Sequence, residues 1–361
     1  MGLVRLFLAW VVAIGHWRVI MLKPLSIDLD DKWIFGFNSG YAVMFFYMIS
    51  GFLITYTLSR NYSQNLAGAC RFYANRFIRI FSLYWPLVGL VFLIVDSAWH
   101  NFVTASIWDK LTGIFLLGMD WRLAFASYPQ QHWVAAIDSL HPAWTLGAEL
   151  TFYLVAPLLM RSWKIGAVLL LASFGLRATV VYSSGVDLQE PWTYQFLGTT
   201  FGFFMLGHLI CLASHRWRIL LQPAIGAALL VCSIAIMTYG GSYAGFDTLR
   251  FWGAVLCFTV ALPAIFEGTK NIRWMNGVGD LSYPVYLVHT AVVTLLGPWL
   301  VSFALPLHAI SKSEAGWLSI VTFLSVTTLA AAVIHRLVEL PVAATLHGLA
   351  RRPQSPARQG A

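Results

Sequence analysis

The chain has 361 residues, of which 59% are hydrophobic and only 11% are charged, and its mean hydropathy is +0.71. This balance excludes an ordinary soluble domain and is typical of a polytopic membrane protein. The formal net charge of +8 does not indicate a nucleic-acid partner, because the basic residues are placed as membrane-topology signals. We expect an all-α fold, since lipid offers backbone polar groups no partners and helices satisfy them internally.

Ten apolar runs are long enough to span a bilayer. They cover residues 3–22, 35–58, 80–95, 144–160, 165–182, 196–214, 219–239, 251–266, 281–303 and 317–337. The first run is expected to be a retained helix rather than a signal peptide, because a second long run follows at once and no clear cleavage site is present. A further apolar stretch, 111–119, is about 14 Å long as a helix, too short to cross. The sequence therefore predicts a bundle of about ten transmembrane helices, with a short re-entrant or interfacial helix near 111–119.

The charges of the loops predict the orientation of this bundle. Ten crossings place both termini on one side, and most Lys and Arg residues fall on that side while most acidic residues fall on the other. Because basic loops stay in the cytoplasm, we expect a multi-pass protein of the bacterial cytoplasmic (inner) membrane with both termini cytoplasmic. Residues 1–340 form one membrane domain, and 341–361 have the composition of a disordered basic tail.

The first run, "RLFLAWVVAIGHW", holds two ionisable residues, Arg5 and His16. They are eleven residues apart, so a helix places them on one face about 16 Å apart along its axis. Ionisable groups are costly in lipid and seldom face it, which favours a shared polar cavity. The alternatives are that Arg5 is an ordinary positive-inside flank and that His16 packs between helices.

The segment "RFYANRFIRIFSLYW" is expected to be a loop after the second helix. It presents Arg76 and Arg79 one turn apart, with no acidic residue between positions 60 and 79. Guanidinium groups bind phosphates through paired hydrogen bonds, so this cluster favours a phosphate-rich cytosolic partner. The alternative is a topology signal that contacts lipid headgroups.

Two later spans also carry polar groups. "HPAWTLGAELTFY" places Glu149 and Tyr153 at i and i+4, although a carboxylate near a helix start can simply be stabilised by the helix dipole. "LSYPVYLVH" sets Ser282, Tyr286 and His289 on one stripe. A polar stripe on an apolar helix indicates a polar interior.

Two features are given structural roles. In "HRLVELP" we expect Arg336 and Glu339 to pair at i and i+3 and Pro341 to end the helix. The four cysteines have no metal-ligand or disulfide-framework spacing, so no metal site is expected; they are Cys70, Cys211, Cys232 and Cys257.

Together these motifs resemble the membrane acyltransferase 3 family over nearly the whole chain. The resemblance lies in R-x10-H in the first span, "FFYMISGFLI", "RFIR" with "LYW", "WTLGAE" with "FYL", "LSYPVYLVH" and "VELP". It implies an integral membrane O-acyltransferase that moves an acyl group, often acetyl from acetyl-CoA, to a hydroxyl of a cell-surface or secreted glycan such as lipopolysaccharide O-antigen. The partners implied are acyl-CoA, a glycan or glycolipid acceptor and membrane lipids, with no metal and no nucleic acid.

The resemblance also implies roles for individual residues. We expect a catalytic group of His16, Glu149, Tyr286 and His289, with His16 as general base because acyl transfer to an alcohol needs a base for the hydroxyl proton, and a donor-binding group of Arg5, Arg76, Arg79 and Ser50 of "SGF". Three positions depart from the family pattern: "GLV" replaces an acid and a glycine, Ser82 replaces a proline and Thr145 replaces a serine. None of these departures removes a chemically active group.

A proton-coupled transporter of a small anionic or sugar-like solute is the alternative, because intramembrane His, Arg and Glu also suit such a carrier. We find no convincing inverted repeat to support it. A non-catalytic scaffold leaves the buried polar groups unexplained. The sequence leaves open the acceptor, the length of the acyl group, and direct transfer versus an acyl-histidine intermediate.

Overall fold

The computed structural model describes residues 1–27, 39–125, 138–160, 162–184, 189–238, 247–304 and 311–350. All regular structure in these ranges is helical, as the composition predicts. The α-helices are α1 (Gly2–Trp17), α2 (Ser39–Asn61), α3 (Leu66–Ile94), α4 (Asp96–Thr104), α5 (Ile107–Phe115), α6 (Met119–Phe125), α7 (Trp144–Leu159), α8 (Trp163–Ser184), α9 (Leu197–Arg216), α10 (Pro223–Thr238), α11 (Leu249–Thr269), α12 (Arg273–Asp280), α13 (Ser282–Ala304), α14 (Lys312–Ile334) and α15 (Leu340–Ala350). Short 3-10 or π segments are η1 (Arg18–Leu22), η2 (Lys23–Leu25), η4 (Asp138–Ala143), η5 (Gln189–Thr193), η6 (Arg218–Leu221) and η7 (His335–Glu339).

In the part of the chain that the structure describes, each of the ten predicted spans lies mainly on a helix, and residues 35–38 and 239 of these spans lie outside that part. Within the described residues, 8 helical segments are long and apolar enough to cross a membrane, which confirms an all-α polytopic membrane protein. The other two expected spans, α7 and α10, have 16 residues each. At 1.5 Å per residue each is about 24 Å long, somewhat less than the hydrocarbon core.

The region of the predicted re-entrant segment, 111–119, contains two short helices. α5 has 9 residues and α6 has 7, so neither can cross the bilayer. α5 ends at Phe115, its C-cap residue Leu116 has a left-handed φ of 62°, and Gly118 follows with φ +77°. This turn folds α6 back against α7, where Gly147 faces the Leu116 carbonyl.

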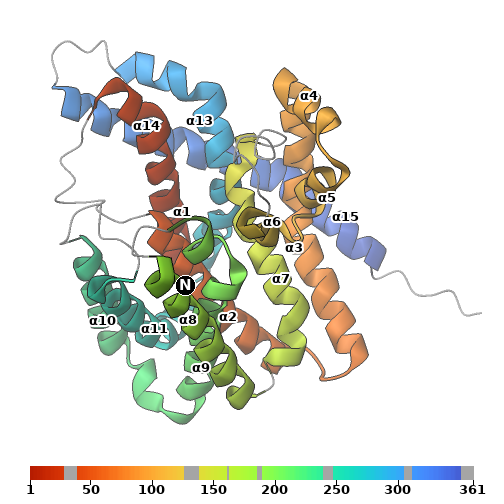
Figure 1. The fold of residues 1–361 in the computed structure, drawn as a ribbon, viewed down its shortest axis with the longest axis vertical. Helices are drawn as coiled ribbons and strands as arrows, with labels where there is room; N and C mark the ends of the chain where they lie inside the picture. Colours follow the sequence, from red (N-terminus) through yellow and green to blue (C-terminus); the bar gives the residue numbers. More distant parts are fainter. Residues whose placement is uncertain are drawn as a thin grey trace, which may run out of the picture.

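The bundle has α1 and α2 at its centre. Figure 1 shows α8 to α11 gathered on one side and α3, α7 and α15 on the other. The contacts agree: α2 packs along α9, α1 packs against α2 and α13, and α3 touches α7 and α15. α1, α2, α3, α7 and α13 therefore surround a common space.

The close packing of α2 on α9 depends on glycine. A side-chain carbon at Gly51 would collide with the backbone oxygen of Phe204, and one at Gly207 would collide with that of Met48. Only residues without Cβ allow two backbones to approach so closely. Because this face of α2 is fixed against α9, Tyr47 and Ser50 on α2 are presented to the central space.

The expectation that Arg76 and Arg79 lie in a loop is wrong. α3 begins at Leu66, where the Asn65 side chain accepts from the Gly68 N–H at 2.8 Å. After this cap no proline occurs until Pro86, so the helix continues through the arginine motif. Both arginines therefore lie on a rigid element.

The end of the last span also differs from expectation. Glu339 pairs with His335, at 2.7 Å from its Nδ1, and not with Arg336. η7 is a π-helical turn, and the chain continues as α15 with Pro341 at its second position, where a missing N–H is tolerated. Residues 340–350, mostly assigned to the tail, are thus helical, and 351–361 lie outside the described residues.

Candidate active site

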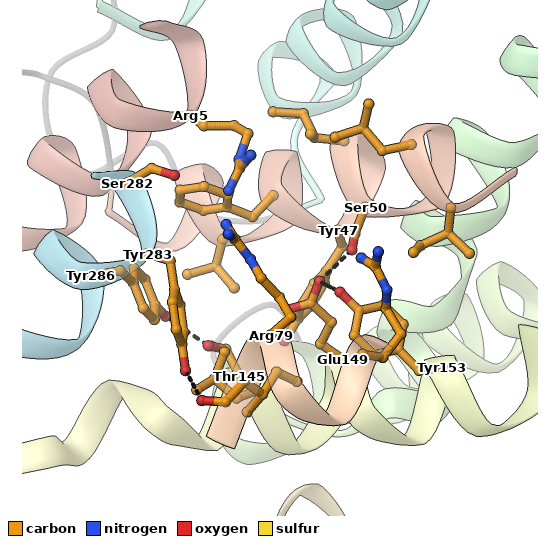
Figure 2. A pocket seen from close by; sticks show the side chains of 18 of the residues that line it. Arg5, Tyr47, Ser50, Arg79, Thr145, Glu149, Tyr153, Ser282, Tyr283 and Tyr286 are labelled. Atoms are coloured by element: carbon orange, nitrogen blue, oxygen red, sulfur yellow. Dashed lines mark hydrogen bonds between the residues drawn. The ribbon is translucent and has the colours of Figure 1, made fainter. Parts of the chain in front are cut away.

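A cavity of about 320 Å³ lies in the space enclosed by α1, α2, α3, α7 and α13. Six of the eight predicted site residues line it: Arg5, Ser50, Arg76, Arg79, Glu149 and Tyr286. They come from five helices that are distant in sequence (Figure 2). The fold therefore gathers most of the predicted site into one pocket.

Three guanidinium groups of the pocket make no ion pair within the described residues, although the carboxylates of Glu149 and Asp280 line the same pocket and attract Arg5 at longer range. Among the described residues, no carboxylate oxygen lies within ion-pair distance, 4.0 Å, of Arg5, Arg76 or Arg79. Figure 2 shows the ends of Arg5 and Arg79 directed toward each other across the pocket, and their charges repel. The three arginines are partly buried, and charges held out of water without an ion pair are costly, so the arrangement is suited to binding an anion with more than one charge.

Aromatic rings hold two of these arginines in place. The Arg76 guanidinium lies 5.7 Å from the ring centroids of both Phe72 and Tyr153, and that of Arg79 lies 5.6 Å from the ring of Tyr283. Cation–π contacts leave the N–H groups available for a ligand. The Nε of Arg76 is buried and has no hydrogen-bond partner among the described residues.

Glu149 is also fixed within the pocket. Its Oε1 accepts a hydrogen bond from Ser50 Oγ at 2.5 Å and another from the Tyr153 hydroxyl (Figure 2). The carboxylate thus joins α7 to α2 at a set position beside the arginines. Ser50, predicted to bind the donor, is engaged with Glu149 instead of pointing freely into the pocket.

Tyr286 is held at another part of the pocket. Thr145 Oγ1 donates to the Pro142 carbonyl at 2.9 Å, so the Tyr286 hydroxyl, 2.8 Å from Thr145 Oγ1, donates to it. Thr145 occupies the position where the family commonly has serine. Its hydroxyl still makes the contact, so this departure does not disturb the site.

His16 and His289 form a pair next to the pocket and do not line it. His16 Nδ1 lies 2.9 Å from His289 Nε2, with the rings stacked at 5.0 Å between centroids. Tyr286 contacts both parts of the site: its side chain lines the pocket, and its ring centroid is 5.9 Å from that of His289. We expected Arg5 and His16 to line one cavity, and only Arg5 lines it.

Sequence reasoning missed Tyr47 and Tyr283, which also line the pocket. The Tyr47 hydroxyl is buried without a hydrogen-bond partner, whereas the Tyr283 hydroxyl donates to the Ile80 carbonyl at 2.6 Å. Tyr47 precedes Ser50 by three residues, so the i, i+3 rule for helix faces would have found it. Buried tyrosines in an apolar span are otherwise hard to distinguish from ordinary packing.

The fold and this pocket define an integral membrane protein with a polar, cation-rich ligand site inside its helical bundle. The profile of the Acyltransferase domain family matches residues 1–336, and the chain belongs to this family. Nodulation protein 10 of Rhizobium leguminosarum bv. viciae is 27% identical to it over 338 residues, which cover 87% of this chain and 90% of that protein. Acyltransferase MdmB of Streptomyces mycarofaciens is 25% identical over 329 residues, covering 83% and 80%. No solved structure matches the chain.

Membership of this family decides between the classes of function that the sequence left open. The protein is a membrane acyltransferase, and the transporter alternative is set aside. An acyltransferase needs both an acyl donor and an acceptor, so this protein must bind two substrates.

Proposed function

We propose that this acyltransferase moves an acyl group, acetyl in the simplest case, from cytosolic acyl-CoA to a hydroxyl of a cell-surface or secreted glycan such as O-antigen. It would work in the bacterial cytoplasmic membrane with both termini in the cytoplasm. The observation that carries the proposal is the set of three guanidinium groups in one pocket that make no ion pair among the residues the structure describes. Acyl-CoA is an acyl donor that also brings several phosphate charges, which such a pocket binds well.

In this proposal Arg5, Arg76 and Arg79 hold the phosphates of CoA, and the pantetheine arm runs through the pocket toward Tyr286. Ser50 acts on the donor side indirectly, by fixing Glu149. Because Tyr286 contacts the histidine pair, a thioester that reaches Tyr286 is near His16. A small displacement of the Tyr286 side chain would bring the thioester and His16 together.

His16 acts as the general base. It takes the proton of the acceptor hydroxyl as that oxygen attacks the thioester carbonyl carbon, and the C–S bond breaks. The proton then passes from His16 to the departing thiolate, so the products are the ester and CoA-SH. Glu149 orients the acceptor, and Tyr286 and His289 support His16.

The direct test measures acyl transfer by the purified protein in nanodiscs, with radiolabelled acetyl-CoA and surface glycans from cells lacking the gene as acceptors. We expect glycans that are heavier by one acyl group by mass spectrometry, with matching ester signals in proton NMR. Glycans of unchanged mass with every acceptor fraction would contradict the proposal.

The role of His16 is tested by His16→Ala, which should abolish product while membrane insertion stays intact. His100→Ala is the matched control, because His100 is exposed on α4 and lies outside the pocket. Near-normal turnover by His16→Ala would remove His16 from the mechanism.

A further inference from the structure

The histidine pair continues into the backbone of α13. His289 Nδ1 lies 2.7 Å from the carbonyl oxygen of Tyr286, one turn earlier on the same helix. Its other nitrogen, Nε2, lies 2.9 Å from His16 Nδ1. A carbonyl oxygen and two imidazole rings thus form one hydrogen-bonded chain.

The chemistry of these groups fixes where the protons lie. A carbonyl oxygen can only accept a hydrogen bond, so His289 Nδ1 must carry a hydrogen. A neutral imidazole has one N–H, and His289 Nε2 therefore presents a lone pair. That lone pair accepts from His16 Nδ1, which must carry the hydrogen of the neutral His16 ring, leaving the lone pair of His16 on Nε2.

We infer that His289 is a positioning residue that fixes the tautomer of His16, so that Nε2 is the basic atom of His16. This inference rests on the proposed function, in which His16 is the general base. The Tyr286 carbonyl fixes His289 in turn, so Tyr286 contributes its backbone to the base and its side chain to the donor pocket.

Burial divides the roles between the two rings in the same way. His289 is fully buried, at 0% exposure, whereas His16 is partly exposed. The partly exposed residue carries the base, and the fully buried residue orients it. The arrangement follows the logic of a catalytic triad, in which a third group holds the imidazole in the productive tautomer; here a neutral carbonyl and a second imidazole take the place of a carboxylate.

The tautomer of His16 can be measured directly by ¹⁵N NMR of histidine-labelled protein in nanodiscs. Signals that vanish in His16→Ala assign the ring. We expect a protonated Nδ1 and an unprotonated Nε2 in the wild type, and a rise of the Nε2–H form in His289→Phe. A protonated Nε2 in the neutral wild-type ring, or an unchanged tautomer ratio in His289→Phe, would overturn the inference.

Kinetics separate positioning from packing. His289→Phe should lower kcat by about 10²- to 10⁴-fold, the range for a general base, with little change in the donor KM. His289→Gln should retain most of the wild-type kcat, because the Gln amide oxygen can accept from His16 Nδ1–H. Near-wild-type kcat in His289→Phe would show that His289 acts only by filling space, and equal loss in the two variants would overturn the role of Nε2 as an acceptor.

The two proposals fail in different ways. A wild type that shows the expected His16 tautomer but transfers no acyl group would refute the proposed function and leave the tautomer assignment in place. Active protein in which His289→Phe keeps both tautomer and turnover would refute this inference alone.

Discussion

Replacing Arg79 by glutamine should weaken binding of the acyl donor far more than it slows transfer. The glutamine side chain would retain some bulk and hydrogen-bonding capacity but lose the charge that the donor phosphates require. No carboxylate of the described residues lies at ion-pair distance from Arg79, so the substitution breaks no ion pair among them. Its effect should therefore fall on the ligand.

The magnitude follows from the contact that is lost. A hydrogen bond to a charged group contributes about 1.5–3 kcal/mol, and 1.4 kcal/mol corresponds to about tenfold in affinity. The donor KM should rise about 10- to 150-fold. Arg5 faces Arg79 and the two charges repel each other (Figure 2). Removing one of them relieves this repulsion, so we expect the increase in donor KM to lie toward the lower end of this range.

The assay is the dependence of initial rate on acetyl-CoA concentration, with kcat and KM determined separately. Arg71→Gln is the matched control on the same helix, because Arg71 is exposed, donates to the Asn61 carbonyl at 3.2 Å and lies outside the pocket. We expect its donor KM to stay within about twofold of wild type. Equal effects of both substitutions, or a loss of kcat with an unchanged donor KM in Arg79→Gln, would refute the docking role.

Three further substitutions test other parts of the structure. Glu149→Gln should lower turnover at least about tenfold, because the acceptor is no longer oriented. The donor KM should not rise, because the substitution removes a negative charge from the pocket that binds the donor phosphates. A raised donor KM would argue against this role of Glu149. Gly51→Ala should destabilise the protein by about 1–3 kcal/mol or more, because the added methyl group collides with the α9 backbone. Gly89→Ala is the control and should not lower the melting temperature, because a Cβ at Gly89 meets nothing within 4 Å. Equal melting temperatures of the two variants would contradict the packing argument. Hydrogen bonds from Ser311 lower the pKa of Glu314 below its usual 4.5. The contribution of Glu314 to stability is therefore full above about pH 4.5 and is lost as the pH falls below that value. We expect Glu314→Gln to reduce the dependence of the melting temperature on pH in this range, and an unchanged dependence would contradict this role of Glu314.

Much of the fold follows from local sequence. Each of the ten apolar runs forms a helix, because a segment in lipid can satisfy its backbone only internally. The helix boundaries were less predictable. α3 starts fourteen residues before the predicted span, at Leu66, because an Asn65 cap and a proline-free stretch extend the helix beyond its apolar part. Hydropathy identifies the portion in lipid and carries no information on where a helix begins in water.

The chemically active residue types were also identified from sequence, since Arg5, Arg76, Glu149 and His289 are costly in an apolar environment and stand out there. Periodicity along a single helix did not determine which of them share a cavity. It placed Arg5 and His16 together, yet Arg5 lines the pocket and His16 pairs with His289 beside it.

The sequence by itself determined that this chain is a membrane bundle and which polar side chains are candidates for its chemistry, because the cost of polar groups in lipid acts on each helix separately. Only the tertiary structure decided that three arginines lie in one pocket and make no ion pair with the described residues, that Glu149 accepts a hydrogen bond from Ser50 and that His289 meets His16. These contacts join helices up to 273 residues apart. They depend on how close the backbones come, which glycines such as Gly51 permit and which no single helix can specify.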